Sequence, residues 1–333
     1  MGKGNGNQEN LSVYKISVII ATANRAESIK GVLNSLLNQE CDGTFEYQVI
    51  VVDNNSIDET KATVTSYVPK FSGRLVYLFE PTQGKSYALN RGIREAKGDI
   101  VAFTDDDVVV DSRWLINIVQ CFEQYHCDGV GGRVLPVYPK ETPQWIKDNP
   151  VQITGITVTF DFGEEIKPFD KSMDRFIGSN FAFKREIFEE CGLFRTDLGP
   201  GKGTSGEDTE FIYRLITRNK ILYYCGKALV WHPVDLQRMS LKYLAQWNIA
   251  IGRFAARMEL ESKEKAFVYY FGVPRYLWRG IIQDFLALIF TVFNRRTSFD
   301  ARRSFFRKVG MIMEYRKQRY IQQSRDRRVV THA

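Results

Sequence analysis

The chain has 333 residues, of which 44% are hydrophobic and 26% are charged, and this balance excludes a mainly disordered chain, a collagen, a coiled coil and a small disulfide scaffold. Its five cysteines are scattered and never form a CxxC pair, which argues against a disulfide framework or a zinc motif and favours a reducing compartment. The net charge of +7 comes from the C-terminal region, where residues 274–333 hold 14 Lys and Arg against 4 Asp and Glu, so no nucleic-acid partner is expected for the main body.

The first third of the chain alternates apolar strands with amphipathic helices. In chain order we expect a strand over 15–21, a helix over 26–39, a strand over 47–53, a helix from residue 58, a strand over 75–79, a helix over 86–96 and a strand over 99–104. The strands are β-branched runs without polar alternation, which is typical of parallel strands buried on both faces. The alternation predicts a doubly wound α/β sheet flanked by helices, in which ligands gather at the carboxyl ends of the strands.

The rest of the chain has a less regular pattern. We expect a strand over 153–162, helices over 185–191 and 208–218, an extended segment over 221–231, and helices after that. Residues 1–12 are rich in Gly and Asn and hold no apolar signal region, so we expect a disordered leader there.

Three successive carboxylates, Asp105, Asp106 and Asp107, follow the strand over 99–104 directly. In extended geometry Asp105 and Asp107 point to one side and Asp106 to the other. Like charges so close together favour a bound cation, and Mg²⁺ or Mn²⁺ prefers oxygen ligands and shared phosphates. The alternative is a solvated acidic turn, which the position at the end of a buried strand disfavours.

Asp53 closes the strand over 47–53, where a carboxylate can accept hydrogen bonds from a base or a ribose. In the loop that follows, we expect Ser56 to cap the next helix, with Glu59 completing a capping box. The glycine pattern argues against a P-loop NTPase and against a dinucleotide-binding dehydrogenase. Gly84-Lys85-Ser86 ends like a Walker A loop, but Phe79 stands where that loop has its first glycine, and no GxGxxG follows the first strand.

Two later features leave alternatives open. Asp208 follows Glu207 at the start of a predicted helix, where it either forms a capping box with Ser205 or accepts a proton from an attacking hydroxyl. His232 stands at the end of the extended segment and is either a packing residue or a ligand.

Seven motifs in order over residues 16–232 resemble those of the family-two nucleotide-sugar glycosyltransferases of GT-A fold: ISVIIATANR, VIVVDNNSIDET, GKSYALNRGI, GDIVAFTDDD, GSNFAFKREIFEECGLF, GEDTEF and VWHP. The resemblance implies a catalytic domain over 13–235, with a nucleotide-binding half over 13–110 and an acceptor half over 111–235, followed by a basic amphipathic helical region over 236–333. It also implies roles for individual residues: Thr22, Arg25, Asp53 and Lys85 at the nucleotide, Asp106 at the ribose, Asp105 and Asp107 as a metal-binding DxD motif, His232 at the metal or diphosphate, and Asp208 of the Glu207-Asp208 pair as catalytic base.

By the same likeness, the reaction is an inverting transfer of one sugar from a nucleotide sugar, for which we expect UDP, to a hydroxyl of a glycan or glycolipid acceptor. It implies a divalent cation, Mn²⁺ or Mg²⁺, at the departing diphosphate. The QxxRW motif and the membrane helices of the family's processive synthases are absent from the sequence, which favours one sugar per encounter. The alternative is a catalytically silent module that binds sugar nucleotides or glycans on the same fold.

The C-terminal region is basic and apolar at once. Residues 276–294 are rich in aromatic and aliphatic side chains, but Arg279 and Asp284 interrupt them and leave too short a run to span a bilayer. The basic residues after 294 alternate with apolar ones, which predicts either a helix lying on an anionic membrane or a helical cap packed on the catalytic domain. We expect a cytoplasmic protein with peripheral contact to the inner face of the cell membrane.

Overall fold

The computed structural model describes residues 14–147, 157–170, 173, 176–199, 204–262, 267–290 and 295–330. The predicted leader over 1–12 lies outside these residues. The chain divides into two compact units. One takes its described residues from Met1–Leu135, Phe160–Phe194 and Asp208–His232, and the other from Pro136–Thr159, Arg195–Glu207 and Pro233–Ala333.

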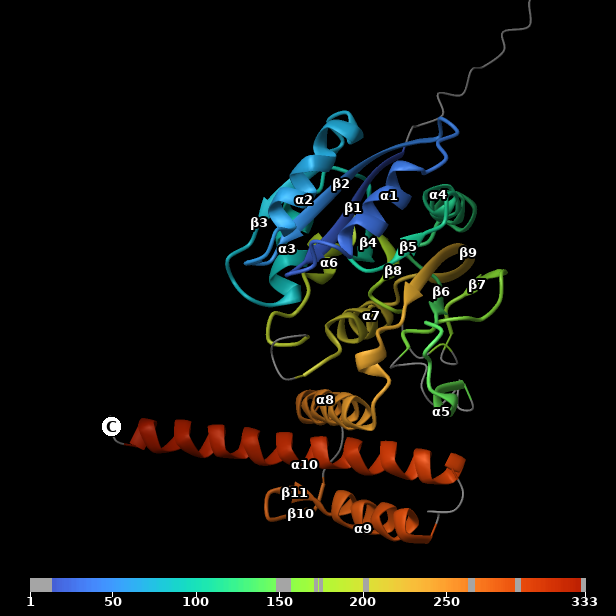
Figure 1. Ribbon diagram of the computed structural model, residues 1–333. Helices are drawn as coiled ribbons and strands as arrows, with labels where there is room; N and C mark the ends of the chain where they lie inside the picture. The colour runs from blue at the N-terminus through green and yellow to red at the C-terminus, as the bar shows by residue number, and fades with distance from the viewer. Residues whose placement is uncertain are drawn as a thin grey trace, which may run out of the picture. The chain divides into compact units, whose positions relative to one another are not determined.

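A mixed sheet forms the centre of the first unit (Figure 1). Its parallel part consists of, in spatial order, β3 (Leu75–Phe79), β2 (Phe45–Asp53), β1 (Tyr14–Thr22) and β4 (Ile100–Asp105). The sheet then continues with β8 (Asn180–Lys184), β6 (Gly129–Val137), β9 (Leu222–Pro233) and β5 (Val109–Val110), and β7 (Ile166–Pro168) pairs with β9. The predicted α/β fold with helices on both faces of the sheet is confirmed.

Helices cover the sheet because its strands are apolar on both faces. In β1 the side chains of Val18, Ile19 and Ile20 are all fully buried, which explains why the sequence shows no polar alternation there. One face packs against α1 (Ile29–Leu37), α2 (Thr60–Tyr67) and α4 (Trp114–Tyr125). On the other face lie α3 (Lys85–Glu95) and a group of aromatic rings around Phe103, which include side chains of α6 (Glu186–Cys191) and α7 (Glu207–Thr217).

The predicted capping box at the start of α2 is wrong. The Ser56 hydroxyl accepts a hydrogen bond from the Asn24 N–H at 2.8 Å, so it is occupied by another loop. The helix begins at Thr60, whose N–H donates to Asp58 at 3.1 Å, and Glu59 is the residue before it. The Ser56 side chain therefore joins two loops and does not cap the helix as the local pattern predicted.

The predicted strand over 153–162 also needs correction. Its part over 153–156 lies outside the described residues, and its described part is turns with one bridge, between Phe160 and Val134. Val158 has a φ of 54°, a left-handed conformation that an extended strand does not contain.

Helices dominate the second unit. They are α5 (Gln144–Lys147), α8 (Leu241–Ser262), α9 (Arg275–Phe290) and α10 (Arg295–Val330). This unit also contains a 3₁₀ turn, η3 (Leu236–Arg238), and a hairpin of β10 (Tyr269–Tyr270) and β11 (Val273–Pro274). Another 3₁₀ turn, η1 (Val68–Phe71), belongs to the first unit. The helix α10 lies between α8 and α9 and packs against both (Figure 1). Among the described residues, no helix combines the length and the apolar run that crossing a bilayer requires.

Two glycines allow α8 and α10 to cross closely. A Cβ atom at Gly252 would collide with the carbonyl oxygen of Arg307, and one at Gly310 would collide with that of Ile249. Apolar side chains of α10 fill the contact, including the buried Met311, Ile312 and Tyr315. Part of the apolar face of this basic helix is thus covered by the neighbouring helices α8 and α9, whereas the two predicted arrangements placed it on a membrane or on the catalytic domain.

A buried carboxylate lies in the same contact. Glu314 of α10 is fully buried and accepts hydrogen bonds from Arg253 at 3.0 Å and Arg257 at 2.7 Å, both on α8. Burial raises the pKa of Glu314, but the hydrogen bonds from Gln318, Arg257 and Arg253 outweigh it, so the pKa lies below the usual range. The carboxylate therefore stays charged between two arginines of α8, one of which, Arg257, also binds Asp197.

We predict that Glu314→Gln lowers the free energy of unfolding by roughly 3–5 kcal/mol, because it removes the buried anion that Arg253 and Arg257 share and leaves Arg257 with its second ion pair, to Asp197 at 3.3 Å. The lowered pKa means that this stabilisation is present at neutral pH and is lost as the pH falls through the folded-state value. Urea unfolding measures the change. Asp300→Asn, which removes an exposed ion pair with Arg303 at 3.7 Å on the same helix, is the control and should cost under about 1 kcal/mol. Equal losses in the two variants would contradict the prediction.

Candidate functional site

Three parallel strands bring polar residues to one edge of the sheet. The register pairs Thr22 of β1 with Asp53 of β2, and Ala21 with Asp105 of β4, so the carboxyl ends of the three strands lie level. The strand order reverses between β1 and β4, and such a reversal opens a crevice beyond the strand ends. The predicted nucleotide and metal residues on these strands are therefore brought together by the fold.

Asp105, Asp107 and His232 form a candidate metal site. One ligand atom from each residue lies within 4.8 Å of the others, and the Nε2 atom of His232 is 3.5 Å from Oδ1 of Asp107. His232 is buried near the end of β9, whereas the two carboxylates are partly exposed. Two carboxylate oxygens and an imidazole nitrogen suit a divalent ion such as Mn²⁺, and the remaining coordination positions would fall to water or phosphate.

Two cations lie against these carboxylates. The Lys85 ammonium, on the first residue of α3, is 2.5 Å from Oδ1 of Asp105, and the Arg25 guanidinium is 3.4 Å from Oδ2 of Asp107. Both cations are partly exposed, so a ligand in solution can contact them while they stay paired with the carboxylates. Side chains of this kind are suited to bind phosphate oxygens beside a metal ion.

Asp106 has a different partner from this group, and it lies in a turn because the strand ends at Asp105, so the extended geometry assumed for the triplet does not continue through it. Its Oδ2 accepts a hydrogen bond of 2.6 Å from the Thr22 hydroxyl, and both residues are buried. Burial raises the pKa of Asp106 to about 6, with Asp107 and Asp105 adding to the rise and the Thr22 hydrogen bond opposing it. A carboxyl that ionises less readily reduces the repulsion within the triplet.

Asp53 is held by protein groups at the end of β2. Its Oδ1 accepts from the Ser56 N–H at 2.9 Å and its Oδ2 from the Tyr77 hydroxyl at 2.7 Å. Burial raises the pKa of Tyr77, and the contact with Asp53 adds to the rise. Asn54, the next residue, accepts from the Gly84 N–H at 2.8 Å and so fixes the turn that carries Lys85.

Asp208 lies at the start of α7, on the other side of Gly178 from the Lys85 ammonium. Its Oδ2 accepts a hydrogen bond from the Gly178 N–H at 3.2 Å and its Oδ1 accepts from Thr209 at 2.7 Å. A Cβ atom built on Gly178 would be 3.3 Å from Asp208 Oδ2 and 3.8 Å from the Lys85 Nζ atom, so Gly178 separates Asp208 from a side chain that contacts Asp105. The residues with the most specific predicted roles thus occur in one neighbourhood.

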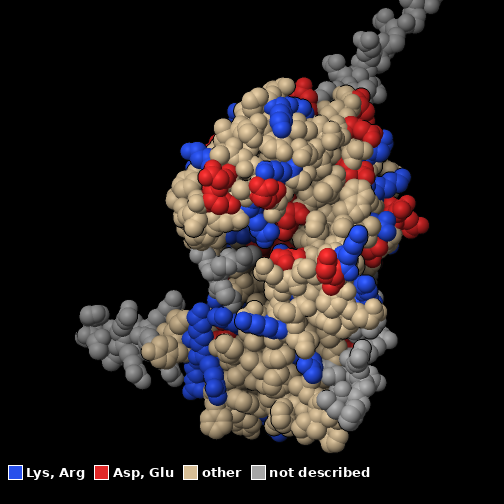
Figure 2. All heavy atoms as spheres, in the orientation of Figure 1, with Lys and Arg blue, Asp and Glu red and all other residues tan. Residues whose placement is uncertain are grey.

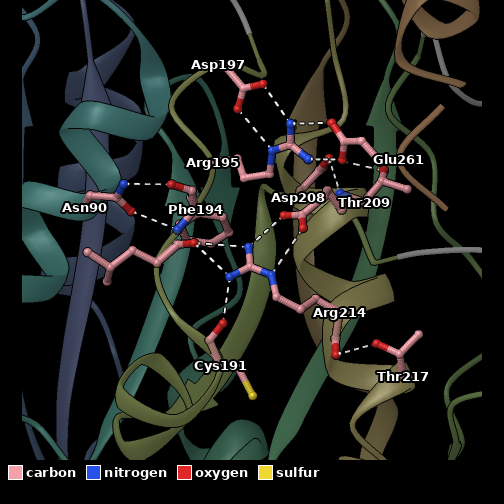
Figure 3. Close-up of polar contacts among 12 residues, drawn as sticks. Asn90, Cys191, Phe194, Arg195, Asp197, Asp208, Thr209, Arg214, Thr217 and Glu261 are labelled. Carbon is pink, nitrogen blue, oxygen red and sulfur yellow. Dashed lines mark hydrogen bonds and ion pairs between the residues drawn. The ribbon is translucent and has the colours of Figure 1, made fainter. Parts of the chain in front are cut away.

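An arginine on the same helix fixes α7 to the preceding loop. Figure 3 shows Arg214 reaching the carbonyl oxygen of Cys191, and it also binds that of Leu193. On the other side of the loop, Asn90 of α3 exchanges two hydrogen bonds with the backbone of Phe194. These contacts tie α7, which carries Asp208, and α3, which begins with Lys85, to one segment of chain.

Glu207 differs in position from its neighbour Asp208. It is buried and belongs to the second unit. Its carboxylate lies next to Gly199, where an added Cβ atom would be 2.9 Å from Oε2 of Glu207. Of the predicted site residues, it is the one that the structure assigns to the other unit.

Sequence reasoning missed two supporting residues at the start of β8. Gly178 leaves the space that Asp208 and Lys85 occupy. Asn180 accepts a hydrogen bond from the Trp114 indole at 2.8 Å and donates to the carbonyl oxygens of Arg133 and Ala228. Both residues stand in the GSNFAFKREIFEECGLF motif, but no role was predicted for either of them.

Comparison with known sequences identifies relatives. The model of glycosyl transferase family 2 matches residues 17–192. The succinoglycan biosynthesis protein ExoM of Rhizobium meliloti is 26% identical over 248 residues, which are 74% of this chain and 76% of ExoM. A glucosyl-dolichyl phosphate glucuronosyltransferase of Haloferax volcanii is 29% identical over 190 residues, 56% of this chain and 57% of that protein. The chain therefore spans little more than half of the second relative.

Solved structures share the fold. A mannosyltransferase from Pyrobaculum calidifontis in complex with GDP-Man and Mn²⁺ aligns with a TM-score of 0.60 and 18% identity, over 91% of this chain and 87% of its own. S. aureus TarS residues 1–349 in complex with UDP-GlcNAc aligns with a TM-score of 0.56 and 18% identity, over 93% of this chain and 92% of its own. At this identity the likeness shows a common fold.

We predict that Asp107→Ala weakens Mn²⁺ binding at least tenfold, because it removes one of three clustered ligands. Calorimetric titration of the full chain with Mn²⁺, with and without UDP, measures the affinity. Asp42→Asn is the matched control, since Asp42 bonds only within its own exposed loop, to Thr44. An Asp107→Ala protein that binds Mn²⁺ as tightly as this control would exclude the ligand role.

Proposed function

The chain belongs to glycosyl transferase family 2, and from its site we propose that it is a metal-dependent, inverting glycosyltransferase that moves one sugar at a time from a nucleotide sugar to a hydroxyl of a glycan or lipid-linked acceptor. The observation that carries this proposal is the proximity of a carboxylate to a candidate metal site: Asp208 and Lys85 flank Gly178, and Lys85 contacts Asp105. A binding module has no need of that carboxylate.

On the donor side, Asp105, Asp107 and His232 would hold Mn²⁺ or Mg²⁺, whose chemistry is to offset the charge that develops on a departing diphosphate. Lys85 and Arg25 are the chain's own cations at this place, and each contacts one of the carboxylates. We propose that they bind the diphosphate oxygens. Thr22, Asp53 and Asp106, at the ends of the neighbouring strands, would contact the nucleoside.

On the acceptor side, Asp208 would be the general base. Backbone N–H groups of Gly178 and Thr209 orient its carboxylate. The base takes the proton of the acceptor hydroxyl while the oxygen forms its bond to the anomeric carbon, and the bond from that carbon to the diphosphate breaks on the opposite face. The product has inverted configuration, no covalent enzyme intermediate forms, and Glu207 would support the position of Asp208.

We propose UDP as the nucleotide. One of the solved relatives holds UDP-GlcNAc and another holds GDP-Man, so the fold accommodates both bases. The lipid-linked acceptor is supported by the name of the Haloferax volcanii relative, a glucosyl-dolichyl phosphate glucuronosyltransferase. Such an acceptor would place the enzyme in the cytoplasm, in peripheral contact with an anionic membrane.

We predict that Asp208→Asn lowers the transfer rate by a factor of at least 10³ and leaves the affinity for UDP and Mn²⁺ within about threefold, because an amide cannot accept the proton. Product formation and nucleotide titration are measured on the same preparation. Glu189→Gln, an equally small change at an exposed residue of α6, is the control and should retain full activity. Loss of nucleotide binding together with activity would indicate a structural role, and retained activity would exclude the base.

We predict that UDP-sugars raise the melting temperature of the chain and that this rise requires Mn²⁺ or Mg²⁺, because a ligand stabilises the native state that binds it. A screen of UDP-, GDP- and dTDP-sugars, each with Mn²⁺ and with EDTA, identifies the donor. Stabilisation by a sugar nucleotide without any transfer to acceptors would favour the silent binding module. Equal stabilisation with EDTA would contradict the metal dependence.

A further inference from the structure

The helix α9 has an apolar face without a partner among the described residues. Five of its large side chains keep between 46% and 80% of their area exposed. They occur at spacings of three and four residues, which puts them on one stripe of a helix. We call this stripe the α9 face; it consists of Ile282, Phe285, Leu286, Ile289 and Phe290.

The opposite side of α9 accounts for its attachment to the second unit. Leu277 is fully buried in the cluster with Met311 and Tyr315 of α10. Asp284 forms an ion pair with Lys308 of α10 at 2.6 Å. Leu277 and Asp284 therefore contact α10 from the side opposite to the α9 face, whose exposed apolar side chains lie together on one stripe rather than singly.

The charged side chains beside the α9 face are positive. Asp284 is the single acidic residue in the sequence of α9, and it points to Lys308. Arg275 and Arg279 are exposed in the first turns of the helix and continue the stripe toward its N-terminus. In Figure 2 this end of the unit, at the bottom of the view, is mostly tan with Lys and Arg beside it.

We propose that the α9 face is a docking surface for an anionic lipid bilayer, with α9 lying in the plane of the headgroups. An apolar stripe flanked by arginines, on a helix too short to span, is the pattern of an interfacial helix. The positive charge of the C-terminal region favours an anionic bilayer over a second copy of the chain. Residues 274–333 carry a net charge of +10, so two copies facing each other would repel, whereas anionic headgroups attract them.

The packed position of α10 assigns the two parts of the basic C-terminal region different roles. Met311, Ile312 and Tyr315 of α10 are buried against its neighbours, so that helix attaches α9 to the unit and adds positive charge. The lipid contact is made by α9. This surface is independent of sugar transfer, although a lipid-linked acceptor would give it a use.

The test is flotation of the full chain with vesicles of phosphatidylcholine alone or with phosphatidylglycerol, without any nucleotide sugar. Leu286→Ser combined with Ile289→Ser should lower the partition coefficient on phosphatidylglycerol vesicles about tenfold or more, because two apolar side chains no longer leave water. Arg275→Gln combined with Arg279→Gln should weaken binding to the anionic vesicles only. Ile221→Ser, a similar change at an exposed isoleucine of the first unit, is the control and should bind unchanged.

Three results would overturn the proposal. The full chain does not float with anionic vesicles, or the Leu286→Ser and Ile289→Ser protein floats as well as the Ile221→Ser control. The third is a dimer, seen by analytical ultracentrifugation without lipid, that the Leu286→Ser and Ile289→Ser changes dissolve, since the α9 face would then belong to a second copy. Transfer to a soluble acceptor is assayed separately, so failure of the proposed enzyme activity is distinguishable from failure of this proposal.

Discussion

Repulsion among three adjacent carboxylates is the constraint around which the first unit is built. Asp105, Asp106 and Asp107 follow one another at the end of a buried strand, with Asp106 buried and its two neighbours only partly exposed. The fold answers each one separately: Lys85 contacts the first, the Thr22 hydroxyl donates to the second, and Arg25 and His232 lie against the third. These partners come from three separate parts of the chain, the end of β1, the start of α3 and the end of β9, so the triplet requires the sheet to assemble before its charges are balanced.

The same requirement explains how much of this site could be predicted. The strands and the acidic triplet are visible in the sequence because a buried strand is a local apolar run, and its last residues lie at the ligand-binding edge of the sheet. The roles of Gly178 and Asn180 depend on contacts with residues far away in the chain, which no local pattern contains. At Ser56 a local pattern was present but gave the wrong prediction, because the hydroxyl binds the Asn24 N–H of another loop and does not cap the helix.

The C-terminal helices show a second limit of sequence reasoning. Periodic apolar residues show that a helix has an apolar face, but they do not show whether another helix covers it. Both α9 and α10 have such residues. Close crossing at Gly252 and Gly310 buries the face of α10, and the face of α9 stays exposed on the outer side of the unit. The difference arises from packing, which the spacing of side chains does not record.

Glu314 has a practical consequence for shortened versions of this chain. Two guanidinium groups of α8 depend on a carboxylate supplied by α10. A protein that stops before α10 would keep both cations and lose the buried carboxylate they share, so that Arg257 would retain Asp197 alone, and it would also lose the apolar cover of α8. Loss of activity in such a truncation would therefore report on unfolding of the remaining helices. Point substitutions on exposed residues are the cleaner way to assign roles to this region.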